Sequence, residues 1–429
     1  MKEKVALKRE LGLTEVTLSG VGIILGAGIY ALIGKATALS GNSVWLSFAL
    51  ASLIAVFTGL SYAELSSMFP RASAEYEYTS NAFGRRLAFI IGWLIILSAV
   101  IGASTVALGF GGYFKALSGT PVITSALLLI IALSILLFRG IKESVWFAII
   151  STLIESAGLI LIIFIGLPYL GKVDYFDMPH GLTGVFQASA LVFFAYTGFE
   201  SIVKLSEETK NPEKTIPKGL MMAILISIVL YILVAISAVS VIGWGKLAAS
   251  DAPFADLAFS AFGSDAFILL AIIALFATAN TVLMMLLGAS RIIYGMADSL
   301  TLPSILGSVH FTRRTPWIAI FAAMLLSMLF VFAGDIAVVA NVDNFTLFVT
   351  FFVINAALIL LRYKAPRTER PFRVPLAIGK FPIMPLFGIV FCVFMLFQLE
   401  WKVLLVGAML VVIGLVLSFV EMNKKTADD

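Results

Sequence analysis

The stretch Gly20-Val-Gly-Ile-Ile-Leu-Gly-Ala-Gly-Ile-Tyr30 puts four glycines into nine residues near the middle of an apolar run (14–39). Each glycine weakens a helix by roughly 1 kcal/mol relative to alanine, and unpartnered backbone groups in hydrocarbon are costly. We therefore expect a broken helix whose second half begins near Gly26. Its free amide hydrogens and positive dipole end would hold an anionic group, most simply a carboxylate. The alternative is a helix-packing seam, because Gly22 and Gly26 also match the Gly-xxx-Gly pattern.

The composition of the whole chain places this stretch in a membrane. Of the 429 residues, 61% are apolar and 13% charged, whereas soluble domains carry about 25% charged residues. The mean hydropathy is +1.06, so only a bilayer can solvate the surface. With one cysteine, Cys392, and two histidines, neither a disulfide framework nor a Cys/His metal cluster is expected.

Apolar runs long enough to cross a bilayer predict an all-α membrane protein with about twelve spans. The runs are 14–39, 43–67, 86–110, 122–138, 143–168, 184–203, 217–243, 266–291, 316–333, 342–361, 382–399 and 402–421. A shorter amphipathic stretch, Pro253–Phe262, is expected to lie as a helix in the membrane interface.

The basic residues predict the orientation of the spans. Of the 29 Lys and Arg residues, all but five fall on the side of the N-terminus if the runs alternate across the bilayer. The exceptions are Lys35, Lys115, Lys172, Lys246 and Lys402. Since basic residues concentrate in cytoplasmic loops, we expect a multi-pass protein of the cell membrane with both termini in the cytoplasm.

The sixth run shows a second anomaly in the segment Phe193-Phe-Ala-Tyr-Thr-Gly-Phe-Glu-Ser201. Gly198 interrupts the helix, and Glu200 places a carboxylate inside the span. This run is the first of a second set of five, as the run 14–39 is of the first set. Interruptions at corresponding positions of two halves indicate a transporter built from inverted repeats, with its site between them.

Five motifs, in order along the chain, resemble the amino acid–polyamine–organocation (APC) transporters, in particular the prokaryotic members that are similar to cationic amino acid transporters. The motifs are Gly22–Tyr30, Tyr62–Gly84, Phe194–Ser201 leading into Glu207–Gly219, Ser290–Pro303 and Arg370–Pro375. The resemblance implies a LeuT-type fold of five plus five inverted helices, with helices 1 and 6 discontinuous, two peripheral helices and alternating access. The expected organisation is a cytoplasmic N-terminus (1–13), repeat 1 (14–168), repeat 2 (184–361), peripheral helices (382–421) and a cytoplasmic tail (422–429).

The same resemblance implies a substrate site at the two interruptions. In the first, a backbone cradle would hold a substrate carboxylate; in the second, carbonyls would take the substrate ammonium. Phe194 resembles the aromatic residue that covers the occluded substrate and is the first candidate gate. Glu200 is a second candidate gate. Because Lys204 follows Glu200 at i+4, a local ion pair between them is the alternative. The cradle consists of Ile24, Gly26, Ala27 and Gly28, and the second segment of Phe194, Ala195 and Thr197.

Two departures from the family pattern bear on coupling and substrate. Glu155 stands where many proton-coupled relatives carry a lysine, near mid-span, where an acid costs roughly 2.5–3.5 kcal/mol. It is expected to carry the proton, or to bind Na⁺ with the hydroxyls of Thr278 and Thr281. In Gly92-Trp-Leu-Ile-Ile-Leu-Ser98, Ser98 replaces the glutamate of relatives that favour cationic substrates. Without that acid a buried substrate cation lacks a counter-charge, which favours a neutral amino acid.

These observations predict a secondary active transporter for small or medium neutral amino acids, proton-coupled and without a cofactor other than H⁺ or Na⁺. Sodium coupling, exchange, transport of polyamines, a solute channel and an amino-acid sensor remain alternatives. No nucleophile–base pair or metal spacing indicates an enzyme. The expected partners are the substrate and the lipid bilayer, without nucleic acid, and the oligomeric state stays open. Glu64, close to the end of its span, is expected to anchor a loop.

Overall fold

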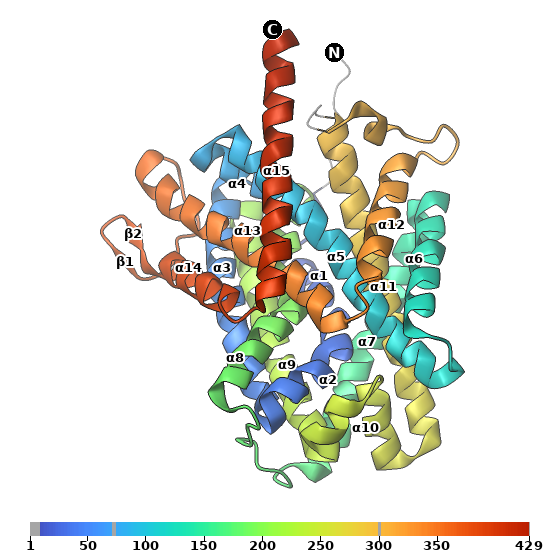
Figure 1. Cartoon of the computed structure of the whole chain (residues 1–429). Coiled ribbons are helices and arrows are strands. Elements are labelled where there is room, and N and C mark those ends of the chain that lie inside the picture. Colours follow the sequence, from blue (N-terminus) through green and yellow to red (C-terminus); the bar gives the residue numbers. More distant parts are fainter. Residues whose placement is uncertain (1–8, 71–73, 299–301, 429) are drawn as a thin grey trace.

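The chain folds into a bundle of long helices with very little other secondary structure (Figure 1). The computed structural model describes residues 9–70, 74–298 and 302–428. Within them, nine helical segments are long and apolar enough to cross a membrane, and three shorter helices are also apolar. The one sheet in this part of the chain is an antiparallel hairpin of β1 (Ala377–Ile378) and β2 (Phe381–Pro382).

Each of the twelve predicted segments coincides with one helix or with a broken pair of helices. In the first half these are α1 (Leu13–Ile24), α2 (Gly28–Ser40), α3 (Val44–Met68), α5 (Arg85–Ser118), α6 (Val122–Arg139) and α7 (Ile141–Gly166). In the second half they are α8 (Gly181–Val192), the 3₁₀ segments η3 (Phe193–Tyr196) and η4 (Phe199–Glu208), α9 (Pro212–Ala249), α11 (Ser264–Asp298), α12 (Trp317–Val331), α13 (Ile336–Lys364), α14 (Ile383–Leu396) and α15 (Trp401–Asp428). An all-α membrane protein is therefore confirmed.

Short elements connect these helices. The stretch expected to form an interfacial helix is helical as α10 (Pro253–Phe262), whereas α4 (Ala74–Phe83) and the β-hairpin were not predicted. Three short 3₁₀ turns complete the described elements: η1 (Gly41–Ser43), η2 (Leu167–Tyr169) and η5 (Ser304–Gly307).

The two ends of the bundle are distinguished by α4 and α10 (Figure 1). The C-terminal end of α15 lies at the end with α4, and α10 lies at the opposite end; we call these the α4 end and the α10 end. Of the predicted cytoplasmic N-terminus, residues 1–8 lie outside the described part, as do Lys2, Lys4, Lys8 and Arg71 of the charge count.

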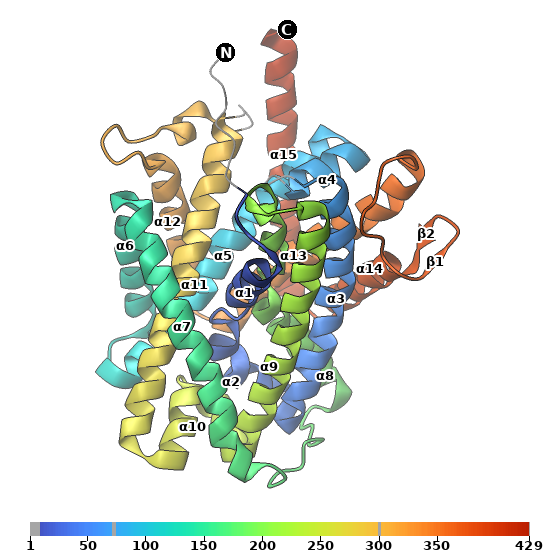
Figure 2. The same ribbon diagram turned by 180° about the vertical axis from the view of Figure 1, so that it is seen from behind.

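The start of the described chain is fixed to the second interrupted span. The backbone N–H of Glu10 donates to the carbonyl of Glu208 (2.9 Å), and that of Lys210 donates to the carbonyl of Leu11 (2.9 Å). These bonds hold the beginning of α1 beside the end of η4. Figure 2 shows α1 on the back of the bundle, between α7 and α9.

The core forms around α5 and α13, which are the most buried of the long helices, while α15 is the least buried of them. α5 packs against α6, α11, α12 and α13, and α3 packs against α9. Small residues permit the closest approaches. At Gly28, for example, a Cβ atom would lie 2.6 Å from the Cα of Ala195, so only glycine fits where α2 meets η3.

Candidate functional site

The first interruption lies at residues 25–27, between α1 and α2, where the glycine-rich stretch predicted it. The N–H of Ala27 donates to the hydroxyl of Thr281 on α11 (2.9 Å). A Cβ at Gly26 would lie 2.9 Å from that same hydroxyl. Among the described residues, no acceptor is bonded to the N–H of Gly26 or Gly28. The break thus leaves two backbone donors at the positive end of α2.

The second interruption lies at Thr197 and Gly198, between η3 and η4. Gly198 has φ 107°, a conformation that favours glycine because other residues clash there. The N–H of Gly198 donates to the carboxylate of Glu200 (2.9 Å), and the hydroxyl of Thr197 donates to the carbonyl of Phe194 (2.8 Å). The chain therefore turns sharply between two short 3₁₀ segments, as the glycine in this span indicated.

One side chain joins the two interruptions. The hydroxyl of Tyr231 on α9 lies 2.6 Å from the carbonyl of Ile24 and 2.9 Å from the carbonyl of Ala195. Both carbonyls belong to the last residues before a break, where helical partners are missing. Sequence reasoning missed Tyr231; the available signal was a tyrosine in the middle of an apolar span.

The breaks face a cavity of about 750 Å³ that extends toward the α4 end. Its wall includes backbone of both interruptions and side chains of α5, α7, α11 and α13. At its outer part it reaches Glu75 of α4 and Lys204 of η4. Leu18 and Ser19 of α1 also line it and are exposed, so the cavity is not fully enclosed.

Between the two breaks and the α10 end, the bundle is closed. The ring of Tyr30 packs edge-on against Phe254 of α10, with 5.2 Å between ring centroids. The hydroxyl of Tyr113 donates to the carbonyl of Tyr30 (3.0 Å). Farther out, Lys115 and Asp251 form an ion pair of 2.8 Å. Apolar rings and an ion pair therefore separate the cavity from this end.

Most of the residues predicted to bind substrate line this cavity. They are Ile24, Gly26, Gly28, Ser98, Phe194, Ala195 and Thr197. Ala27 is not part of the lining, and its N–H is already bonded to Thr281. The structure thus brings the two predicted segments together, and the donors left at the first break are those of Gly26 and Gly28.

Of the predicted coupling residues, Thr281 lines the cavity, whereas Glu155 and Thr278 are not part of its wall. Glu155 of α7 is completely buried, and neither of its carboxylate oxygens has a hydrogen-bond partner among the described residues. The hydroxyl of Thr278 donates to the carbonyl of Ala274 in its own helix (2.7 Å). The hydroxyl of Thr281 faces the first break instead. No hydrogen bond of the described residues joins Glu155 to either threonine.

Asn280 of α11 connects Glu155 with the cavity. Its side chain faces the Glu155 carboxyl, donates to the hydroxyl of Thr152 (3.1 Å) and forms part of the cavity wall. From the sequence, Asn280 is a polar mid-span residue with a structural role as the simpler interpretation. Its position between a buried acid and the cavity makes it a second candidate for the coupling site.

The two predicted gating residues lie on opposite sides of the second break. Phe194 is 2% exposed and lines the cavity. The Glu200 carboxylate caps the N–H of Gly198. The ammonium of Lys204 lies 3.6 Å from the carboxylate of Glu75 on α4. Lys204 therefore links η4 to α4 at the mouth of the cavity.

Sequence reasoning also missed Asp343 on α13. Its carboxylate faces the side chain of Ser98 on α5, and the residue is 1% exposed. An acid of a neighbouring helix therefore lies next to Ser98, the α5 position at which the sequence has no acid. The signal was a lone aspartate within a long apolar run.

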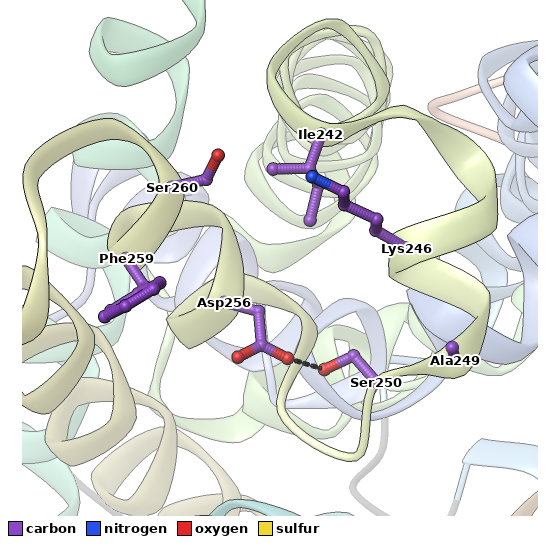
Figure 3. A pocket seen from close by; sticks show the side chains of 7 residues that line it. All are labelled: Ile242, Lys246, Ala249, Ser250, Asp256, Phe259 and Ser260. Carbon is purple, nitrogen blue, oxygen red and sulfur yellow. Dashed lines mark hydrogen bonds between the residues drawn. The ribbon is translucent and has the colours of Figure 1, made fainter.

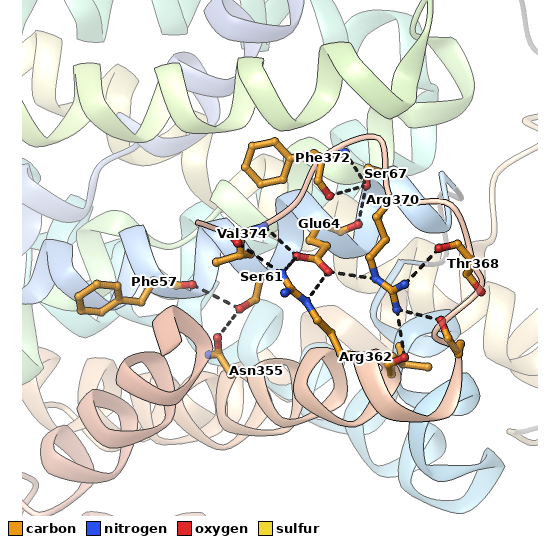
Figure 4. Close-up of polar contacts among 12 residues, drawn as sticks. Phe57, Ser61, Glu64, Ser67, Asn355, Arg362, Thr368, Arg370, Phe372 and Val374 are labelled. Atoms are coloured by element: carbon orange, nitrogen blue, oxygen red, sulfur yellow. Dashed lines mark hydrogen bonds and ion pairs between the residues drawn. The ribbon is translucent and has the colours of Figure 1, made fainter. Parts of the chain in front are cut away.

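A separate polar cluster fixes a loop at the α4 end (Figure 4). The carboxylate of Glu64, at the end of α3, accepts a hydrogen bond from the Nε of Arg362 (2.9 Å) and lies 3.2 Å from the Nε of Arg370. The N–H of Val374 donates to the same carboxylate (2.8 Å). Burial lowers the pKa of Arg370, which lies outside the spans, and the neighbouring Glu64 opposes that shift. The predicted role of Glu64 as a loop anchor agrees with these contacts.

A second, smaller pocket of about 400 Å³ lies at the α10 end (Figure 3). Asp256 and Ser250 are joined by a hydrogen bond of 2.5 Å in its wall, and Lys246 lies on the opposite side. None of its lining residues lines the central cavity. It contains neither of the two helix interruptions, so the central cavity is the candidate site.

Known proteins of similar sequence are amino acid permeases and other transporters. A family profile described as amino acid permease matches residues 11–424. The branched-chain amino acid permease BcaP of Bacillus subtilis is 33% identical over 98% of this chain and 94% of the relative. The methylthioribose transporter of Bacillus subtilis is 30% identical over 98% of this chain and 94% of the relative. Cationic amino acid transporter 2, vacuolar, of Arabidopsis thaliana is 32% identical over 85% of this chain and 61% of that relative.

Proposed function

We propose, because this chain belongs to the amino acid permease family, that it takes up a small or medium neutral amino acid together with protons by alternating access. The observation that carries the proposal is the meeting of two interrupted helices at one cavity, joined by Tyr231. Half-helix ends that face a cavity are suited to hold both charged groups of a zwitterion. In this account the two halves form the five-plus-five inverted arrangement of the APC family.

The first break provides the partner for the substrate carboxylate. The N–H groups of Gly26 and Gly28 lie at the positive end of α2 and line the cavity. A carboxylate there would accept hydrogen bonds that the helix itself cannot supply. Ala27 contributes differently, because its N–H holds the break to Thr281.

The second break provides partners for the substrate ammonium. Carbonyls at the end of η3 and of α1 carry partial negative charge, and each carbonyl oxygen has two lone pairs. The oxygens of Ile24 and Ala195 use one lone pair on Tyr231. The second lone pair remains for an ammonium, and Phe194, beside it, is placed to cover the bound substrate.

The cavity wall supports a neutral substrate side chain. Besides Ser98, the lining includes the apolar side chains of Ile95, Ala99 and Leu347. Binding an apolar side chain against such walls is favoured by about 25 cal/mol for each Å² of apolar surface removed from water. That a 33% identical relative is named a branched-chain amino acid permease supports this substrate class.

Glu155 is the candidate proton carrier. An unpartnered, buried carboxyl avoids the cost of a charge in hydrocarbon by holding a proton. Asn280 faces this carboxyl and lines the cavity, and the next residue, Thr281, holds the first break. Proton loss at Glu155 would therefore change the contacts of α11, the helix whose Thr281 is bonded to the carboxylate cradle.

The conformation corresponds to one side of the transport cycle. The cavity reaches the α4 end, while Tyr30, Phe254 and Tyr113 close the α10 end. The distribution of basic residues favours a cytoplasmic position for the α4 end. In our proposal the molecule is inward-facing, and the outward-facing state forms when the α10 layer opens and the α4 end closes.

Uptake into liposomes that contain the purified protein tests the proposal. We expect saturable, counterflow-capable uptake of a neutral amino acid that an inward proton gradient drives above equilibrium and that a Na⁺ gradient does not. Esters and decarboxylated analogues of the substrate should compete poorly because they lack the carboxylate. Flux that never saturates would indicate a channel, and binding without uptake would indicate a sensor; either result overturns the proposal.

A further inference from the structure

A buried carboxyl that the proposed transport mechanism does not use lies behind one wall of the central cavity. Asp343 of α13 is 1% exposed, and neither of its carboxylate oxygens has a hydrogen-bond partner among the described residues. No ion pair of the described residues includes it. An acid inside a span costs roughly 2.5–3.5 kcal/mol and is functional by default.

The Asp343 carboxyl packs against α5 at Gly102, where no side chain covers the backbone. A Cβ at Gly102 would lie 3.2 Å from the Oδ2 of Asp343 and 2.9 Å from the Sδ of Met285. Glycine at this position therefore leaves room for the carboxyl and the thioether side by side. Ser98 stands one helical turn before Gly102, on the same face of α5, and its side chain faces the carboxyl.

Only small or flexible groups separate this carboxyl from the substrate. Ser98 and Met285 line the cavity, as does Leu347, one turn after Asp343 on α13. A methionine side chain has three rotatable bonds and repacks easily, so its displacement would open a path along Ser98. Asp343 itself is not part of the cavity wall. It lies immediately behind that wall.

The electrostatic surroundings favour a positive charge at this point. Among the described residues no basic side chain pairs with Asp343, and a neighbouring charged group, Glu200 of η4, is another acid. Besides Ser98, the hydroxyl of Thr346 on α13 faces the carboxyl. The neighbours on α5 and α11 (Ser98, Gly102 and Met285) carry no titratable group. A cation that reached the carboxyl would therefore be its first counter-charge.

We propose that Asp343 is a specificity-determining residue that forms, with Ser98, a subsite for the terminal ammonium of a basic amino acid. The inference rests on the proposed function and widens its substrate range from neutral to lysine-type side chains. The two breaks hold the α-carboxylate and α-ammonium, and the aliphatic stem lies along Ala99 and Met285. With a neutral substrate the carboxyl keeps a proton; an arriving ammonium displaces that proton to water, so the charge of the subsite stays balanced.

The geometry also selects among cations. One carboxyl and one hydroxyl, reached past Met285, suit a compact ammonium with three donors, whereas a guanidinium needs a planar, bidentate partner and more space. We therefore expect lysine and ornithine to bind more tightly than arginine.

Equilibrium binding to the purified full-length protein tests this subsite. Labelled leucine, lysine and arginine are the probes, and pH is recorded in weakly buffered solution. For the wild type we expect lysine to compete with leucine and to release about one proton for each molecule bound, while leucine releases none. In Asp343→Asn the ratio of lysine to leucine affinity should fall by about 100-fold, because the ammonium loses its buried counter-charge. Ser104→Ala, on α5 but bonded to the carbonyl of Ser327, is the matched control and should leave the ratio unchanged.

If Asp343→Asn does not insert into the membrane correctly, a substitution of Ser98 tests the same subsite. Ser98→Ala retains the acid and removes only the hydroxyl, so the same ratio should fall about tenfold. The subsite is refuted if wild type binds leucine and not lysine, or if both variants keep the wild-type ratio. It is also refuted if Asp343→Asn loses proton-driven leucine uptake, since Asp343 would then carry the coupling proton. Failure of wild type to bind any amino acid would instead remove the proposed function.

Discussion

Glu64 and Glu155 are both completely buried acids, but their surroundings are opposite. Glu64 is held by Arg362, Arg370 and the N–H of Val374 at the α4 end. Glu155 lies in the middle of α7 without a hydrogen-bond partner for its carboxyl among the described residues. A partnered acid stabilises one arrangement of the chain, whereas an unpartnered acid is stable only with a proton. In our proposal, Glu64 therefore has a structural role and Glu155 a functional one.

The largest effect on stability is expected for Glu64→Gln. The substitution leaves two buried guanidinium groups without their counter-charge, and breaking a buried pair in this way costs about 3–5 kcal/mol. Thermal unfolding of the detergent-purified variant measures the loss. Glu400→Gln, at an exposed position, is the control and should change stability by less than about 0.5 kcal/mol. A Glu64 variant as stable as this control would contradict the structural role.

Arg370→Lys should have the next largest effect. The Arg370 guanidinium pairs with Glu64 and also donates to the carbonyls of Leu361, Ala365 and Thr368. A lysine ammonium cannot reproduce this fork, so we expect a loss of about 1.5–3 kcal/mol. The same unfolding measurement applies, and an unchanged midpoint would show that the charge alone, without the geometry, fixes the loop.

Tyr231→Phe tests the hydroxyl that joins the two helix interruptions at the candidate site. The loss of its hydroxyl releases the carbonyls of Ile24 and Ala195, at a cost of about 1 kcal/mol in stability. Because both carbonyls face the substrate in our proposal, we also expect about tenfold weaker substrate binding, measured by competition with a labelled amino acid. Unaltered binding would mean that the two breaks are held in place without this link.

The smallest effect on stability is expected for Glu155→Gln. Among the described residues the carboxyl has no hydrogen-bond partner to lose, and the amide is of similar size and can still face Asn280. The unfolding midpoint should therefore stay within the range of the Glu400→Gln control. A loss comparable with that of Glu64→Gln would show that Glu155 has a structural partner after all. This result would remove the contrast between the two acids.

Much of the architecture follows from the sequence, because a bilayer imposes simple rules. Span length and the requirement to satisfy backbone groups predict the helices and the break after Ile24. Gly198 likewise predicts the second break, and Glu64 is recognisable as an anchor from its place at the end of a span. The helix α4 and the β-hairpin have no comparable signal, since they lie outside the hydrocarbon and depend on tertiary contacts.

The contents of the site are less predictable than its position. Three of the four cradle residues and Ser98 line the cavity, but the link through Tyr231 depends on how α9 packs against two other helices. Asp343 shows the same limit. Along the sequence Ser98 and Asp343 are far apart, so the missing acid on α5 looks decisive; in space the two side chains face each other. A residue's neighbours on other helices are set by packing, which no local pattern records.

The most direct test of the account is proton-driven accumulation by wild type and Glu155→Gln in liposomes, measured with a labelled neutral amino acid. We expect wild type to accumulate the substrate when the pH gradient is applied. The variant should reach no more than equilibrium while it still exchanges internal for external substrate, because the site remains and only the proton carrier is lost. Accumulation by Glu155→Gln at the level of wild type would contradict the claim that this unpartnered carboxyl couples the proton to transport.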